Sequence, residues 1–175
     1  MVISIKRAYA IFEKVKIVGL YVSGGTIFFM MLFIVTDILS RNLFKSSLLG
    51  AYEITQYYLM PLAVFPALAY AYGTGIMPRI GILVSKLKQT YQKWITVLLL
   101  GFELVLFLLL TYYGWQYALI GTSETLGFSS GGEILPIYPV LYFVPLGFFM
   151  LSIEVFFLLI KNLYSKKPSY VMKEN

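Results

Sequence analysis

The sequence predicts an all-α integral membrane protein with four transmembrane helices, and two observations support this fold class. Hydrophobic residues make up 59% of the 175 residues and charged residues only 13%, whereas soluble domains usually carry about 25% charged residues. The hydrophobic residues also gather in stretches of about 20, the length that an α-helix needs to cross about 30 Å of hydrocarbon. We therefore expect a single membrane domain over residues 1–175.

Four such stretches follow one another along the chain. We predict spanning helices at about residues 15–38, 52–73, 94–118 and 138–161. The first is too long for a signal-peptide core and no small-residue cleavage pattern follows it, so we expect it to be retained. Pro61 and Pro66 lie inside the second stretch, where each removes a helix hydrogen bond and predicts a kink. A broken helix can also mark a transporter's ion site, but no paired break or polar cluster accompanies these prolines.

The lysine and arginine residues predict the orientation of the chain. Twelve of the 14 lie at the two termini or between the second and third stretches: Lys6, Arg7, Lys14, Lys16, Arg79, Lys86, Lys88, Lys93, Lys161, Lys166, Lys167 and Lys173. The other two connections contain only Arg41 and Lys45. Because cytoplasmic loops carry an excess of Lys and Arg, we expect both termini and the middle loop to be cytoplasmic. Basic flanks of this kind favour anionic lipid headgroups over nucleic acid as partners.

The middle loop has the pattern of an amphipathic helix at about residues 79–93. The apolar positions at intervals of three or four are Ile80, Leu83, Leu87, Tyr91 and Trp94. Such a helix is expected to lie along the inner membrane interface, with its lysines toward the headgroups. The alternative is a polar loop that merely contains some aliphatic residues.

Two tryptophans and three basic residues are predicted membrane-interface anchors. Trp115 follows Trp94 by 21 positions, which is about 31 Å along a helix. The pair is therefore expected to mark the two interfaces of the third span. Arg79, Lys86 and Lys88 are the anchors that the interfacial helix would contribute.

The sequence offers no catalytic or cofactor site. It contains no cysteine and no histidine, which excludes Ser-His-Asp and Cys-His catalysis, disulfides, iron–sulfur clusters and the usual zinc and haem ligands. The glycine pairs Gly24–Gly25 and Gly131–Gly132 do not belong to a phosphate-binding loop. We expect the first pair to allow close helix packing and the second pair to form a turn.

Two acidic residues lie inside predicted spans. Glu103 and Glu154 are both expected about 10–14 Å from the inner interface, in the third and fourth spans. A charge at this depth is costly and normally faces a partner or water, and we expect no Lys or Arg of this chain at that depth. One interpretation is a proton or cation relay. We favour the other, which is protonated carboxyls or hydrogen bonds to Tyr, Ser or a neighbouring subunit, and hypothesise that both residues face another protein.

The connection between the first two spans carries Asp37, Arg41, Lys45 and Glu53. Asp37 and Arg41 are four positions apart, so they can pair if the helix persists. Glu53 suits the first turn of the second span, where the helix dipole favours an acid. These charges either only cap the membrane edge, or Arg41 also contacts Glu53 and determines how the two spans meet. Lys45 is expected to be solvated.

Several short motifs follow one another from about Val35 to Lys161. They are Arg41 in "DILSRNLF", Glu53 in "GAYEITQYYL", the exit "AYGTGIMPRIGIL", then "LTYYGWQYAL", and "LPIYPVLYFVPLGF" before a basic end. Their order and spacing resemble the small membrane subunit (DctQ-like, Q subunit) of tripartite ATP-independent periplasmic (TRAP) transporters.

The resemblance implies an accessory role. In these secondary transporters a large membrane subunit carries the substrate and sodium sites and moves as an elevator, and the small subunit scaffolds it. An external substrate-binding protein delivers the substrate, typically an organic acid such as a dicarboxylate or sialic acid. The resemblance thus implies symport, a complex with these two partners, and a location in a bacterial or archaeal cytoplasmic (inner) membrane.

Two other function classes compete with this one. A small homo-oligomeric transporter or channel would need polar groups along a path through the membrane, and Glu103 and Glu154 supply only part of one. A membrane enzyme or cytochrome-like bundle is disfavoured because histidine and cysteine are absent. The structural or subunit-interface candidates are therefore Asp37, Arg41, Glu53, Glu103 and Glu154.

Overall fold

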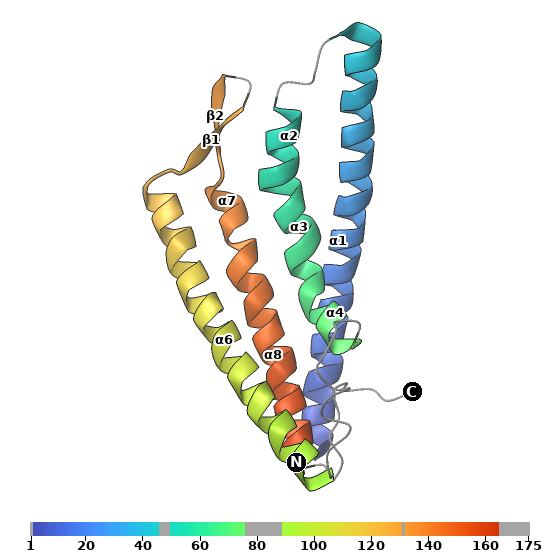
Figure 1. The fold of residues 1–175 in the computed structure, drawn as a ribbon, viewed down its shortest axis with the longest axis vertical. Helices are drawn as coiled ribbons and strands as arrows, with labels where there is room; N and C mark the ends of the chain where they lie inside the picture. Colours follow the sequence, from blue (N-terminus) through green and yellow to red (C-terminus); the bar gives the residue numbers. More distant parts are fainter. Residues whose placement is uncertain (1, 46–49, 76–88, 131, 165–175) are drawn as a thin grey trace.

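The computed structural model describes residues 2–45, 50–75, 89–130 and 132–164. Its elements, in chain order, are α1 (Val2–Phe44), α2 (Ala51–Ile54), η1 (Thr55–Leu59), α3 (Met60–Val64), η2 (Phe65–Ala67), α4 (Leu68–Gly73), α6 (Gln89–Ser123), β1 (Gly127–Ser130), β2 (Glu133–Pro136), α7 (Tyr138–Leu141) and α8 (Phe143–Tyr164). The helices run along the long axis of the molecule, with α8 and the α2–α4 segment between α6 on one side and α1 on the other (Figure 1).

Three helices in the described part of the chain are long and apolar enough to cross a membrane. They are Arg7–Phe44, Tyr91–Ser123 and Tyr138–Tyr164, which contain the first, third and fourth predicted spans. The second predicted span, 52–73, is helical over its whole length, but it is divided among five short segments. It therefore contains no unbroken helix of spanning length.

The two prolines lie where the second span changes its helix type. Pro61 follows the π-helical segment η1, and Pro66 lies inside η2, which is a 3₁₀-helix. Proline has no amide hydrogen to donate, so the regular hydrogen-bond ladder cannot continue through either position and shifts to wider or tighter turns. The regular α-helix is thus interrupted at Pro66 and in the turn that directly precedes Pro61.

Glycines allow the neighbouring helices to approach this interrupted segment closely. A Cβ at Gly19 of α1 would overlap the carbonyl oxygen of Pro66, and one at Gly147 of α8 would lie 2.9 Å from the Cβ of Phe65. Small residues at these contacts let helix backbones come together. The same role predicted for Gly24–Gly25 is wrong within this chain, because a Cβ at either glycine would meet nothing within 4 Å.

A β-hairpin, which the sequence did not predict, connects α6 to α7. β1 and β2 pair antiparallel, with Phe128 opposite Leu135. Gly132 has φ of 94° at the turn between them, in agreement with the turn predicted there. The Phe128 ring packs on Tyr57 with 4.6 Å between centroids, and the hydroxyl of Tyr58 donates a hydrogen bond to the carbonyl of Pro136. These contacts join the hairpin to the start of the second predicted span.

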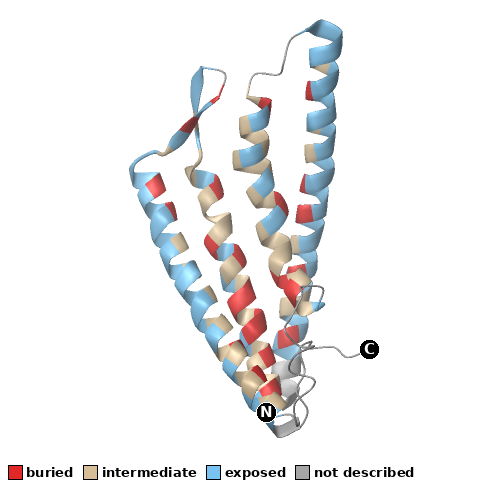
Figure 2. Ribbon diagram, in the orientation of Figure 1, coloured by how far each residue is buried: buried red, intermediate tan, exposed pale blue. Residues whose placement is uncertain are grey.

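Burial differs strongly between the inner and outer helices. The apolar core is formed by Tyr72, Leu100, Leu151, Val155 and Leu158. In the helix Tyr138–Tyr164, 39% of the most apolar 18 residues is buried. In each of the other two helices of spanning length, the corresponding share is 11%. Figure 2 shows buried positions along α8 and a mostly exposed α6 and upper α1. The exposed apolar faces of α1 and α6 are suited to lipid or to another membrane protein.

Candidate functional site: two carboxylates within the helical array

Glu154 of α8 is completely buried and forms an ion pair with Lys16 of α1. The Lys16 Nζ lies 2.6 Å from Glu154 Oε2, and the two side chains are 3% and 0% exposed. The Tyr9 hydroxyl donates a hydrogen bond to Glu154 Oε1 at 3.0 Å and accepts one from Lys16 Nζ at 3.0 Å. Both carboxylate oxygens are therefore hydrogen-bonded inside the chain.

This ion pair overturns one prediction. We expected no basic residue of the chain at the depth of Glu154, because Lys16 was assigned to the cytoplasmic flank of the first span. The helix α1 instead begins at Val2, so Lys16 lies well inside it and its side chain reaches α8. Glu154 is consequently turned toward its own chain rather than toward another protein.

The surroundings of the pair are aromatic and tightly packed. Lys16 Nζ lies 4.7 Å from the ring centroid of Tyr9 and 5.4 Å from that of Phe12, distances at which aromatic faces attract a cation. A Cβ at Gly73 would lie 2.6 Å from Glu154 Oε1 and 2.8 Å from Lys16 Nζ. Three elements, α1, α4 and α8, thus meet at this ion pair.

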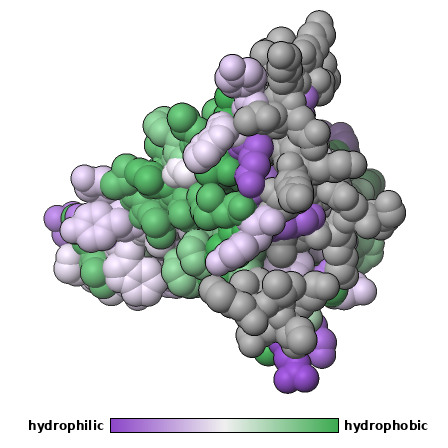
Figure 3. Space-filling view, turned by 90° about the horizontal axis from the view of Figure 1, so that it is seen from below, coloured by the Kyte–Doolittle hydropathy of each residue, from purple (hydrophilic) through white to green (hydrophobic). Residues whose placement is uncertain are grey.

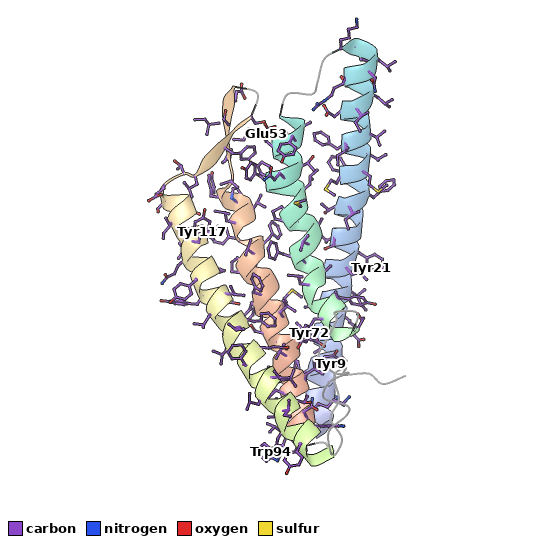
Figure 4. The ribbon with its side chains drawn as sticks, viewed as in Figure 1. Tyr9, Tyr21, Glu53, Tyr72, Trp94 and Tyr117 are labelled. Carbon is purple, nitrogen blue, oxygen red and sulfur yellow. The ribbon has the colours of Figure 1, made fainter. Side chains whose placement is uncertain are left out.

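Glu103 of α6 has a different environment. The hydroxyl of Tyr72 donates a hydrogen bond to Glu103 Oε2, and the Glu103 side chain is only partly buried. Tyr72, labelled in Figure 4, directly precedes Gly73, so consecutive residues of α4 lie beside the two carboxylates and place them at a similar level of the molecule. Among the described residues, no Lys or Arg forms an ion pair with Glu103.

The charges predicted at the external corner lie at the opposite end of the array. Arg41 Nη2 is 2.8 Å from Asp37 Oδ2, and the two side chains are 57% and 11% exposed. This is the i,i+4 pair expected if the helix persists, and α1 does continue to Phe44. Within the described residues, Arg41 and Glu53 form no ion pair, so of the two alternatives for this corner the structure gives no support to the one that pairs them. Lys45 is exposed.

The membrane-interface candidates are only partly described. Trp94 and Trp115 lie on the single helix α6 and are 69% and 45% exposed. The Trp115 ring also packs edge-on against Tyr142, with 5.6 Å between centroids. Arg79, Lys86 and Lys88 lie outside the described residues, as does most of the predicted interfacial helix. Its last residues, 89–93, belong to α6, because the apolar pattern there continues into the third span.

A comparison with protein families identifies the kind of transporter component. Residues 30–164 match the family described as tripartite ATP-independent periplasmic transporters, DctQ component. The chain belongs to this family. It is therefore a small membrane component of a TRAP transporter, as its motifs indicated. A search of curated proteins finds no match to the chain.

Within this DctQ-family chain, both carboxylates accept hydrogen bonds from tyrosines, as one expectation had it, but sequence reasoning did not identify Tyr9 and Tyr72 and missed Lys16. Glu103 and Glu154 lie inside the matched segment, whereas Tyr9 and Lys16 precede it. The sequence did indicate that Tyr9 and Lys16 lie on one face of a helix, because they are seven positions, or two turns, apart. It did not indicate that this face packs against Glu154 of α8.

Proposed function

We propose that this chain is the scaffold subunit of a sodium-coupled TRAP transporter that takes up an organic acid. In this proposal the large membrane subunit binds and moves the substrate and sodium, and a substrate-binding protein outside the membrane delivers the substrate. The observation that carries the proposal is the DctQ match, which covers residues 30–164 of the 175.

The geometry of the array supports a static role. The buried Lys16–Glu154 pair joins α1 to α8, and Gly73 brings α4 against the same pair. The carboxylates of Glu103 and Glu154 lie at a similar height along the helices, and both accept hydrogen bonds from tyrosines of the same chain. A conducting path instead needs polar groups along the whole length of the membrane. The arrangement therefore favours a scaffold over the homo-oligomeric transporter or channel.

We also propose how the chain lies in a bacterial or archaeal inner membrane. The chain crosses the membrane four times, and residues 52–73 form the second span. Both termini are in the cytoplasm, and a helix at about 79–93 lies on the inner lipid surface. The supporting observation is the distribution of Lys and Arg. Because the chain has no cysteine, single cysteines at Ile134 and Tyr164, which are 78% and 72% exposed, can report the side of the membrane.

In intact cells, a membrane-impermeant maleimide should label the cysteine of Ile134→Cys and should reach that of Tyr164→Cys only after the membrane is opened. The reverse pattern would overturn the orientation. Equal labelling of both positions in intact cells would overturn it as well, since the two residues would then lie on one side.

Reconstitution in liposomes tests the function itself. Liposomes containing this chain, the large membrane subunit of its transporter and the substrate-binding protein should take up the organic acid when an inward sodium gradient is imposed. Liposomes without this chain should lose that uptake, and liposomes with this chain alone should show none. Sodium-driven uptake by this chain alone would overturn the scaffold role, because the transport site would then lie within it.

A further inference from the structure

The inward side of α1 is polar, whereas the outward surface of the molecule is largely apolar. Seen from the lower end, hydrophobic side chains gather on the side of the molecule where α6 lies (Figure 3). α1 also turns large apolar side chains outward. Over residues 7–44, its buried positions all carry a polar group, and they are Tyr9, Lys16, Ser23, Thr26 and Asp37. Polar groups inside a membrane helix array need hydrogen-bond partners within the array.

Ser23 is the buried residue of α1 whose partner is missing from the described part of the chain. Its side chain is 2% exposed, and no hydrogen-bond partner is directed to its Oγ there. By contrast, Thr26 Oγ1 donates to the carbonyl of Val22 at 2.8 Å, and Ser152 Oγ donates to a carbonyl of its own helix at 2.9 Å. A buried hydroxyl without a partner is costly, and ordered water often satisfies such a group.

Ser23 lies opposite the break in the second predicted span. α1 and the α2–α4 segment run in opposite directions (Figure 1), and Gly19 of α1 packs against Pro66. Ser23 follows Gly19 by one turn, so it lies level with residues about one turn before Pro66, in α3. α1 and α3 are in contact, and Ala63 of α3 is buried. Ala63 shares a face with Pro66 because it precedes it by three positions.

Pro66 leaves a carbonyl group at this level without its usual donor. In an α-helix the amide of residue 66 would donate to the carbonyl of Leu62, but proline has no amide hydrogen. A carbonyl group points toward the C-terminus of its helix, and a side chain leans toward the N-terminus. Because the two helices are antiparallel, the Leu62 carbonyl and the Ser23 side chain both point toward the level of Gly19 and Pro66. An acceptor and a donor are therefore directed into the same part of the contact between α1 and α3.

We propose that Ser23 and the Leu62 carbonyl bind one buried water molecule, which joins α1 to α3 at the Pro66 break. The water accepts a hydrogen bond from the Ser23 hydroxyl and donates one to the carbonyl oxygen. Both groups are uncharged, and Gly19 and Ala63 have the smallest side chains, so the contact suits a small neutral molecule. Ordered water is one way in which proline-interrupted membrane helices satisfy their freed backbone groups. The site lies within this chain and does not depend on the proposed function.

A map of the full-length chain at a resolution that shows ordered water tests the site directly. A peak should lie about 2.5–3.0 Å from both Ser23 Oγ and the Leu62 carbonyl oxygen. It should be lost in Ser23→Ala and kept in the matched control Ser152→Ala, whose hydroxyl bonds its own helix instead. A direct hydrogen bond from Ser23 to a carbonyl group, or no peak at this place, would overturn the proposal.

Unfolding of the purified chain in detergent gives a second test, because the sign of the effect depends on the partner. If water bridges the two helices, Ser23→Ala should lower the ratio of folded to unfolded chain about 5-fold, the effect of one hydrogen bond. If the hydroxyl had no partner, its removal would leave that ratio unchanged or raise it. Either of these two results would overturn the proposal.

Pro66→Ala tests the second partner of the water. Alanine restores an amide that can donate to the Leu62 carbonyl, so Ser23→Ala should have a smaller effect in this background than in the unmodified chain. The matched control is Pro61→Ala, which acts on the carbonyl of Tyr57 instead, and there the effect of Ser23→Ala should stay about 5-fold. An equal effect in all three backgrounds would show that Leu62 does not hold the water, and would overturn the proposal.

Discussion

Glu154 and Glu103 lie at a similar level of the array, yet their environments are opposite. Glu154 is completely buried and receives an ammonium group and a phenol hydroxyl. Glu103 is partly exposed and receives one phenol hydroxyl from Tyr72. The difference follows from the position of their helices, since α8 is an inner helix and α6 an outer one. It shows that an acidic residue in a membrane helix gains its role from what its helix packs against.

The same comparison separates a carboxylate that is neutralised within the chain from one that forms no ion pair among the described residues. Both oxygens of Glu154 accept hydrogen bonds, from Lys16 and Tyr9, whereas Glu103 accepts a hydrogen bond from Tyr72 at Oε2. Substitutions at the two sites should therefore differ in how much they lower the stability of this subunit. Changes around Glu154 should cost more than changes at Glu103.

The largest effect is expected from Glu154→Leu. Removing the carboxylate leaves the buried Lys16 ammonium unpaired, and breaking a buried ion pair in this way costs about 3–5 kcal/mol. Unfolding of the purified subunit in detergent measures the loss. The double variant Lys16→Met with Glu154→Leu should recover most of it, because no unpaired charge remains. A double variant as unstable as the single one would contradict this explanation.

Gly73→Ala should have the next largest effect. The added Cβ would lie within 3 Å of both Glu154 Oε1 and Lys16 Nζ, so the pair must shift, and overpacking of this kind costs about 1–3 kcal/mol. The matched control is Gly24→Ala, whose Cβ would meet nothing within 4 Å. The same unfolding measurement should show a loss for the first variant and none for the second. Equal losses would mean that helix geometry, rather than contact with the ion pair, is responsible.

Tyr72→Phe should destabilise the isolated subunit by about 1 kcal/mol, the usual contribution of one hydrogen bond. A double-mutant cycle with Glu103→Leu, which removes the acceptor, measures the coupling between the two side chains. The coupling should be smaller than that between Lys16 and Glu154, since no opposite charges are involved. Equal coupling at the two sites would remove the distinction between them.

The smallest effect is expected at the external end of α1. Arg41 is 57% exposed, and exposed ion pairs contribute about 0–1 kcal/mol. Arg41→Ala should therefore leave the unfolding of the subunit almost unchanged. Glu53→Ala should not add to it, because no ion pair joins these two residues within the described part of the chain. A loss comparable to that of Glu154→Leu would show that the external corner is structurally essential.

The helical stretches could be predicted from the sequence because local composition determines them. The first, third and fourth spans and the Asp37–Arg41 pair all depend on residues within one helix. The two prolines also act locally, and the interruptions occur where they stand. The hairpin was missed because each strand has only four residues. Its contacts with Tyr57 and Tyr58 join segments that are far apart in the chain.

The sequence by itself determined the membrane class, the three long apolar helices and the resemblance to the family, because composition, periodicity and motif order are properties of neighbouring residues. Only the tertiary structure decided which carboxylate is neutralised within the chain. The ion pair joins Lys16 and Glu154 across 138 positions, and the missing side chain at Gly73 leaves room for it where α4 packs against α1 and α8. No local pattern contains that contact, so the two glutamates could be told apart only once their helices were packed.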